Sequence, residues 1–270
     1  MSKPLLKVED LSISFEQYGR GLKKFISKPI QSLNIEIYRG EILAIVGASG
    51  SGKSLLAHAI MGILPPNAVV NGRIFYNDEI LDSKRIKKYR GNKIAFVPQS
   101  VNYLDPSMKV KNQVKIGLEG NKQEKKIIQE EIFEKFGLKK SDGERYPYQL
   151  SGGMLRRVLF ATSIGKNTEL IIADEPTPGI HQSVLDIVLK QLRDFADKGM
   201  GVMLITHDIG SAIKIADRIT VFKDGNTIET SPSSYFIGNG EKLQEEYSRK
   251  LWCSLPQNHF LEVESDGIDS

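Results

Sequence analysis

The chain has 270 residues, 40% of them hydrophobic, and a formal net charge of +4, so it can bury a large core and lacks the basic excess typical of nucleic-acid-binding proteins. Its single cysteine, Cys253, excludes an internal disulfide framework and a cysteine metal cluster. No apolar run approaches the roughly 20 residues of a membrane span, and no signal-peptide core follows Met1, so we expect a protein that stays in the cytoplasm.

The first part of the chain predicts antiparallel strands ahead of a buried strand. Apolar and polar residues alternate over residues 5–15 and 33–38, as they do in strands with one buried face. The basic segment 16–29 between them is expected to be a solvated loop. Residues 42–46 are continuously apolar, which predicts a buried strand.

A glycine-rich segment follows this buried strand and precedes a helical pattern over residues 55–61. It consists of Gly47, Ala48, Ser49, Gly50, Ser51, Gly52, Lys53 and Ser54. Glycines let backbone amides point at a phosphate chain, and a helix N-terminus adds partial positive charge. Lys53 can then reach the β- and γ-phosphates, and the Ser54 hydroxyl can hold magnesium. The order of strand, glycines, Lys-Ser and helix predicts a phosphate loop rather than a chance turn.

The middle of the chain predicts two strands, followed by a mostly helical insertion. The helix after Ser54 is expected to stop before Pro65-Pro66, and residues 69–76 to form a strand with a turn at Asn71-Gly72. Residues 93–99 predict a strand that runs into a loop. An amphipathic helix is expected over residues 122–136, ended by Gly137, with apolar residues at Ile128, Ile132 and Phe136, Ile127 beside them and charges opposite.

Strands and helices alternate again in the second half. We expect helices over residues 150–164, 184–196 and 209–216, strands over 170–173, 201–206 and 219–222, and a hairpin turn at 223–226. This alternation predicts an α/β fold with a mostly parallel sheet covered on both faces. We expect one domain over residues 5–250, with its core at about 5–98 and 165–230 and a helical lobe at about 99–164. Residues 231–270 form a short tail, with 262–270 disordered.

Four further features could serve a nucleotide. Asp174 and Glu175 follow a buried strand, where Asp174 could hold hydrated magnesium and Glu175 could polarise an attacking water. Gln99 and His207 also follow strands, and could ligate magnesium and donate to a γ-phosphate. Ser151, Gly152 and Gly153 open a helix as a second anion-binding nest, which we call the Ser-Gly-Gly nest. Taken singly, each would more often be a helix cap or a solvated loop residue.

Together and in this order, these motifs make the chain closely resemble an ABC-type ATPase subunit over about residues 5–229. The resemblance implies a P-loop NTPase of ABC type, with an antiparallel β subdomain and a helical lobe. It implies that Phe15 stacks on adenine, and that two Mg²⁺-ATP molecules lie between the phosphate loop of one subunit and the Ser-Gly-Gly nest of the other. It also implies that the lobe and the Gln99 loop touch a permease.

Finer features are similar to the peptide/nickel importer branch. They are residues 46–54, Pro98-Gln99 followed by Leu104-Asp105-Pro106, Met154, and residues 247–256. The resemblance implies a peripheral protein at the cytoplasmic face of the membrane, with two permease subunits, an extracellular solute-binding protein and a peptide, nickel or metal–metallophore cargo. No nucleic acid is expected as a partner. An exporter ATPase, a DNA-repair type ATPase and a translation ATPase remain alternatives, although the last two usually need longer insertions or two cassettes.

One segment departs from the family pattern. After Asp174-Glu175-Pro176-Thr177 the chain continues with Pro178, Gly179, Ile180 and His181 instead of a small residue, Ala, Leu and Asp. The resemblance implies that this loop shapes the site of the other subunit. We therefore expect a heterodimer with two unequal ATP sites, unless His181 is a tolerated surface substitution. His58, His181, His207 and His259 lack a metal-ligand spacing, and His58 is expected to have a core role.

Overall fold

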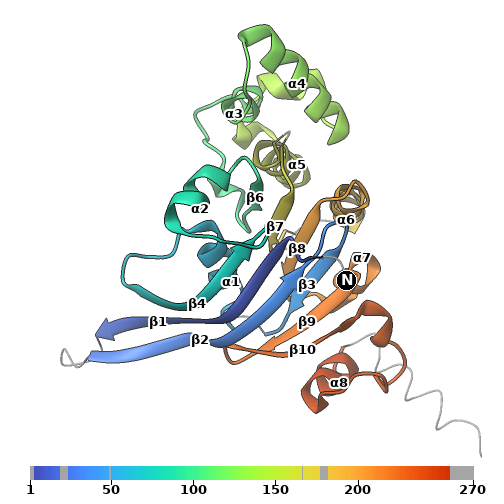
Figure 1. Ribbon diagram of the computed structural model, residues 1–270. Helices are drawn as coiled ribbons and strands as arrows, with labels where there is room; N and C mark the ends of the chain where they lie inside the picture. The colour runs from blue at the N-terminus through green and yellow to red at the C-terminus, as the bar shows by residue number, and fades with distance from the viewer. Residues whose placement is uncertain (1–2, 19–23, 49, 166, 177–181, 256–270) are drawn as a thin grey trace, which may run out of the picture.

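The computed structural model describes residues 3–18, 24–48, 50–165, 167–176 and 182–255, without the side chains of residues 18 and 182–184. Ten strands of this part form one sheet in the order β5-β4-β1-β2-β10-β9-β3-β8-β7-β6 (Figure 1). In chain order they are β1 (Leu6–Tyr18), β2 (Lys24–Ile37), β3 (Ile42–Val46), β4 (Ala68–Tyr76), β5 (Glu79–Ile80), β6 (Ile94–Val97), β7 (Leu170–Asp174), β8 (Gly201–Thr206), β9 (Arg218–Lys223) and β10 (Asn226–Pro232).

The sheet has a parallel half and an antiparallel half, as the sequence predicts. Strand β3 pairs in parallel with β8 and β9, and β7 pairs in parallel with β6 and β8. Strands β1, β2, β4 and β5 pair antiparallel, and so do β9 and β10. The turn between β9 and β10 has positive φ at Asp224 and Gly225, the geometry of a type I′ hairpin. The predicted fold class is confirmed.

Eight α-helices of the described chain lie against this sheet or form the lobe. They are α1 (Lys53–Met61), α2 (Ser83–Tyr89), α3 (Val110–Ile116), α4 (Lys122–Lys135), α5 (Gly152–Ser163), α6 (Gln182–Asp197), α7 (Ile209–Ile215) and α8 (Glu246–Cys253). On β3, Leu43 and Ile45 belong to the core that includes α1 and the antiparallel strands, whereas Ala44 and Val46 belong to the core shared with α5, α6 and α7. Strand β3 is therefore buried on both faces, which its apolar run predicts.

The expected solvated loop over residues 16–29 is wrong. Strand β1 continues to Tyr18 and β2 begins at Lys24, with Gln17 opposite Phe25 and Glu16 opposite Ile26. The two strands form a long antiparallel arm (Figure 1). Backbone hydrogen bonds pair the described parts of the two strands, although the charged Glu16 and Lys24 are exposed there, so the charge pattern of the segment resembled that of a loop. The arm also exposes the apolar Phe25 and Ile26.

Three local expectations also need correction. Asn71-Gly72 is no turn but lies inside β4 at a bulge, where Gly72 has φ +97° and an added Cβ would lie 2.5 Å from the Asp10 carbonyl oxygen. Helix α1 ends earlier than the prolines require, because Gly62 takes a left-handed conformation at its C-terminus. Of the apolar residues predicted for α4, Phe136 at its C-terminus is buried and Ile132 packs against the core. The buried face also carries Gln129 and Phe133, which were not expected, because the neighbouring α3 and α5 contact that side.

The segment after β10 carries α8 back onto the sheet. Trp252 is buried and its indole Nε1 donates to the Gly238 carbonyl at 2.8 Å. The Glu229 carboxylate accepts from the backbone amides of Gln244 and Glu245, at 3.0 and 3.1 Å, just before α8 begins. The expected disorder of residues 262–270 lies outside the described residues. None of the helices in the described part of the chain has the length and apolar character of a bilayer span.

Candidate functional site

The phosphate loop joins the carboxyl end of β3 to α1 through close backbone contacts. An added Cβ at Gly47 would lie 2.1 Å from the Phe222 carbonyl oxygen, and one at Gly52 would lie 2.8 Å from that of Pro29. Gly52 also caps α1 with φ +100°, a conformation that L side chains rarely adopt. Gly50 has φ +79°. Ser49, predicted as part of the loop, lies outside the described residues.

Lys53 is a buried cation inside this loop. Its side chain is 5% exposed, and Nζ donates to the carbonyls of Gly47 and Ala48 at 2.9 and 2.8 Å, and to Ser51 Oγ at 3.3 Å. Burial lowers the pKa of Lys53, while Glu175 and Asp174 nearby work in the opposite direction. The ammonium group is held by neutral acceptors, so an anion that replaced them would gain a charge-assisted bond.

Ser54 and Asp174 meet at the same edge of the sheet. Ser54 Oγ at the start of α1 donates to Asp174 Oδ1 at the end of β7, at 3.0 Å. Asp174 is buried, and this burial raises the pKa of its carboxyl group. A hydroxyl and a carboxylate oxygen are donors that Mg²⁺ accepts, with phosphates and water completing its octahedral shell. The donor set therefore fits the predicted magnesium site.

Glu175 and His207 also face each other across two neighbouring strands. Glu175 Oε2 lies 2.8 Å from His207 Nδ1, and the Glu175 amide donates to the Ile205 carbonyl at 2.8 Å. Glu175 has φ +45°, a strained backbone for a residue with a side chain, and such strain often occurs at functional sites. The Glu175 side chain is buried, whereas that of His207 is 59% exposed.

Predicted residues of the phosphate loop, together with Gln99 and Glu175, line one cavity of about 270 Å³. Its walls include Gly50, Gly52, Lys53, Ser54, Gln99 and Glu175, with Pro29 and Leu55. The cavity is thus formed by the phosphate loop, the segment after β6 and the end of β7. Carboxyl ends of parallel strands meet at one edge of a sheet, which explains the convergence of residues far apart in the chain.

Asp174 and His207 do not line the cavity themselves but contact Ser54 and Glu175, which do. Two further predicted parts lie elsewhere. The Ser-Gly-Gly nest opens α5, where Ser151 Oγ accepts from the Met154 amide at 3.3 Å, and an added Cβ at Gly152 would meet no atom within 4 Å. Phe15 lies in β1 and packs, partly buried, against the core of the antiparallel strands. Neither lines the cavity. The described chain therefore contains a nest that has no phosphate loop facing it.

Arg156 is a site neighbour that sequence reasoning missed. It lies in α5, and its Nη1 donates to the carbonyls of Gln99 at 2.6 Å and Pro98 at 3.4 Å. The available signal was a charge at a position of α5 that the apolar pattern places in the core.

The comparisons with known proteins agree on one family. The family model described as "ABC transporter" matches residues 30–178. The chain is 34% identical to the oligopeptide transport ATP-binding protein OppD of Lactococcus lactis subsp. cremoris (strain SK11), over 99% of this chain and 79% of that one. It is 31% identical to the dipeptide transport ATP-binding protein DppD of Bacillus subtilis (strain 168), over 98% and 81%.

Two solved structures share the fold. One is a dimeric ATP-binding cassette in a post-hydrolysis state with ADP and phosphate, with a TM-score of 0.74, 26% identity, and coverage of 84% of this chain and 98% of that one. The other is cbiO1 of Clostridium perfringens, part of an ABC transporter complex, with a TM-score of 0.74, 28% identity, and coverage of 97% and 100%. From the family match and this near full-length similarity, we conclude that the chain belongs to the ABC transporter family, as one of its ATP-hydrolysing subunits.

Proposed function

We propose that the chain powers the import of peptides through a membrane permease by hydrolysing ATP. The observation that carries the proposal is the cavity where Lys53, Ser54, Gln99 and Glu175 meet, beside Asp174. The peptide cargo is supported by the oligopeptide and dipeptide transport proteins to which almost the whole chain is similar.

In this proposal each residue of the site has one role in binding or hydrolysing ATP. Lys53 exchanges its bonds to the Gly47 and Ala48 carbonyls for bonds to the β- and γ-phosphates. Ser54, Gln99 and Asp174 hold Mg²⁺, which when bound neutralises charge on the transferring phosphoryl group. Glu175 accepts a proton from the attacking water or orients it, and His207 donates to the γ-phosphate.

The contact between Glu175 and His207 supports the roles assigned to these two residues. Nδ1–H of His207 can donate to the Glu175 carboxylate, which would hold both side chains at the open edge of the site. The exposed imidazole can donate from Nε2 to a phosphate oxygen at the same time only when both ring nitrogens carry a proton, so the proposed role requires the imidazolium form. Glu175 is held from the backbone side by its amide bond to Ile205.

A second subunit would complete the site. We propose that the Ser-Gly-Gly nest binds the γ-phosphate held by the phosphate loop of a partner ATPase, and that Phe15 stacks on adenine. ATP would then close the dimer, and hydrolysis would remove the bridge. The dimeric state of a similar cassette supports this arrangement. The proposed heterodimer with unequal sites depends on Pro178, Gly179, Ile180 and His181, which lie outside the described residues.

The proposed assembly contains two permease subunits and an extracellular solute-binding protein, with this chain at the cytoplasmic face of the membrane. Nickel or a metal–metallophore complex is the second candidate cargo, which rests on the resemblance of the sequence motifs to the peptide/nickel importer branch. The exporter and nucleic-acid-handling alternatives receive no support from the peptide-transport relatives.

Uptake by cells tests the proposal directly. We expect cells with the intact chain to accumulate a radiolabelled oligopeptide, and cells with Lys53→Met to lose this uptake, because the buried cation of the phosphate loop is removed. The matched control is Lys250→Ala, which removes an exposed ion pair on α8. Peptide uptake unchanged by Lys53→Met, with nickel uptake lost instead, would reject the peptide cargo.

A further inference from the structure

Arg156 is a buried charge that bonds only to neutral groups in the described part of the chain. Its side chain is 5% exposed, Nη1 donates to the Gln99 and Pro98 carbonyls, and Nε is buried without a hydrogen-bond partner. Burial lowers the pKa of its guanidinium group. A cation kept from water without a carboxylate is costly to folding. Its position in the core therefore needs a reason other than stability.

The two acceptors of Arg156 lie in the segment that carries the Gln99 side chain. Pro98 and Gln99 connect β6 to the short 3-10 helix Val101–Tyr103. The Gln99 side chain is exposed and lines the cavity with Lys53 and Glu175. Arg156 thus fixes the backbone at Gln99 while the amide side chain stays available to a ligand.

The other end of this link is the helix that carries the Ser-Gly-Gly nest. Arg156 lies five residues after Ser151, less than one and a half turns into α5. Helix α5 also lies against β6. A helix is stiff over so short a distance, so a displacement of the Gln99 backbone is passed to the nest through one side chain.

We propose that Arg156 is a positioning residue that aligns the Gln99 amide with the magnesium site and couples its position to the Ser-Gly-Gly nest. The inference rests on the role proposed above for Gln99. Loss of the guanidinium leaves the cavity residues in place but frees the backbone that carries Gln99. Misplacement of a ligand by about 1 Å can reduce a rate by roughly 100-fold.

A double-mutant cycle tests this role in the transporter complex purified with this full-length chain, assayed with Mg²⁺ and ATP. Arg156→Met should lower kcat by roughly 10- to 100-fold, leave KM for ATP little changed, and raise the magnesium concentration needed for half-maximal hydrolysis. Arg156→Lys should recover most of the rate, because a lysine ammonium can donate to the same carbonyls. In a Gln99→Ala background, Arg156→Met should cause no further loss, since residues that act through one contact are not additive.

Gln113→Leu supplies the matched control. Gln113 is a buried polar residue of the same lobe, and it bonds the backbone of Asp105 and Met108. Its substitution should destabilise the lobe without changing the magnesium dependence. Losses that simply add in the Arg156 and Gln99 double variant would overturn the inference and leave the proposed function intact. If Gln99→Ala alone hydrolyses ATP normally, the role of Gln99 is wrong, and the positioning role of Arg156 falls with it.

Discussion

His207 Nδ1 lies 2.8 Å from Glu175 Oε2, and this contact joins the ends of two adjacent parallel strands. Glu175 has a positive φ and its amide is bonded to Ile205. The bond to Ile205 thus fixes the backbone of Glu175 directly after β7, and the imidazole of His207 contacts its carboxylate. Such preorganisation suits a group that must meet a water molecule in a single geometry.

Glu175→Gln should bind ATP normally and nearly stop hydrolysis. The amide keeps the size and one acceptor oxygen for His207 but is no longer a base, and loss of a general base lowers rates by roughly 10²–10⁴-fold. Single-turnover phosphate release, measured with an ATP-binding titration, distinguishes the two effects. Hydrolysis at the normal rate would show that the assigned role of Glu175 is wrong. A second variant, His207→Ala, should slow hydrolysis because it removes the imidazole that contacts Glu175, although the base itself stays in place.

The parts of the fold and site that the sequence predicted are those encoded by local patterns. Strand β3, the glycines of the phosphate loop and the turn at Asp224-Gly225 each follow from neighbouring residues, so their geometry agrees with expectation. The apolar runs over residues 170–173 and 201–205 predict two buried parallel strands, and Glu175 and His207 follow them. Both residues therefore lie at the carboxyl edge of the sheet.

The features that the sequence did not predict depend on partners far along the chain. The arm of β1 and β2 is an exception, because its strands are neighbours in the chain and Gln17 pairs with Phe25, but its charged residues resemble those of a loop. The bulge at Gly72 exists because the Asp10 backbone approaches it. Arg156 was missed because its acceptors are carbonyls 57 and 58 residues away. The charge on the apolar face of α5 marked Arg156 as unusual, but its acceptors left no trace in the sequence, since any residue type supplies a carbonyl.

The carboxylate of Glu169 should make the stability of the sheet depend on acid pH. Burial opposes its ionisation, but ion pairs with Lys93 and Arg39 outweigh this and lower its pKa from 4.5 to about 2. A carboxyl group with a depressed folded pKa stabilises the protein above the ordinary value of 4.5, and loses this contribution as the pH falls toward 2.

Glu169→Gln should therefore be less stable than the wild type near pH 7, and the difference should shrink between about pH 4.5 and pH 3. Urea unfolding at a series of pH values measures it. A stability difference that stays constant over this range would mean that the ion pairs contribute nothing to folding.

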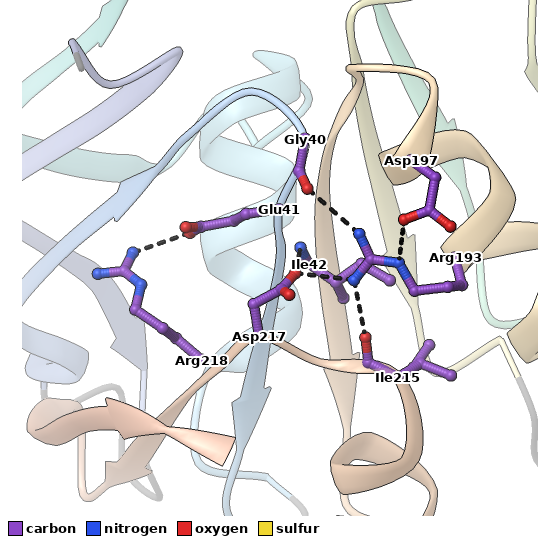
Figure 2. A network of polar contacts seen from close by, with 8 residues as sticks. All are labelled: Gly40, Glu41, Ile42, Arg193, Asp197, Ile215, Asp217 and Arg218. Atoms are coloured by element: carbon purple, nitrogen blue, oxygen red, sulfur yellow. Dashed lines mark hydrogen bonds and ion pairs between the residues drawn. The ribbon is translucent and has the colours of Figure 1, made fainter. Parts of the chain in front are cut away.

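Arg193 connects α6 to the amino end of β3 at the edge opposite the cavity (Figure 2). Its guanidinium pairs with Asp197 and Asp217, both at 2.8 Å, and donates to the carbonyls of Ile215 and Gly40, both at 3.2 Å. Asp217 also accepts from the Ile42 amide at 2.7 Å. The beginning of the central strand is thus held by a chain of charge-assisted bonds.

We expect Arg193→Met to destabilise the chain by about 2–3 kcal/mol, because hydrogen bonds to charged groups contribute about 1.5–3 kcal/mol and several acceptors lose their donor. Lys250→Met removes an exposed pair with Glu246 and should change stability little. Denaturant midpoints of the two variants give the comparison. Equal effects would show that the cluster at Arg193 acts as an ordinary surface ion pair.

Glu229 should control the docking of α8, and the only tryptophan of the chain reports it. Burial works against its ionisation, but the bonds that its carboxylate accepts from Ser231 and from the backbone amides of Gln244 and Glu245 outweigh burial and lower its pKa. The contribution is present above the ordinary value of 4.5 and is lost as the pH falls through the lowered one. Trp252 belongs to α8 and packs edge-on against Phe236.

Glu229→Gln keeps the shape of the side chain but replaces an ionised acceptor with a neutral one, which weakens both amide bonds. Trp252 emission should then shift to the red at a lower urea concentration than the loss of overall secondary structure measured by circular dichroism, because α8 detaches before the sheet unfolds. Glu246→Gln, on the exposed face of α8, is the control and should leave the two transitions coincident. Coincident transitions in Glu229→Gln as well would mean that α8 is held by Trp252 and its apolar neighbours, independently of the carboxylate.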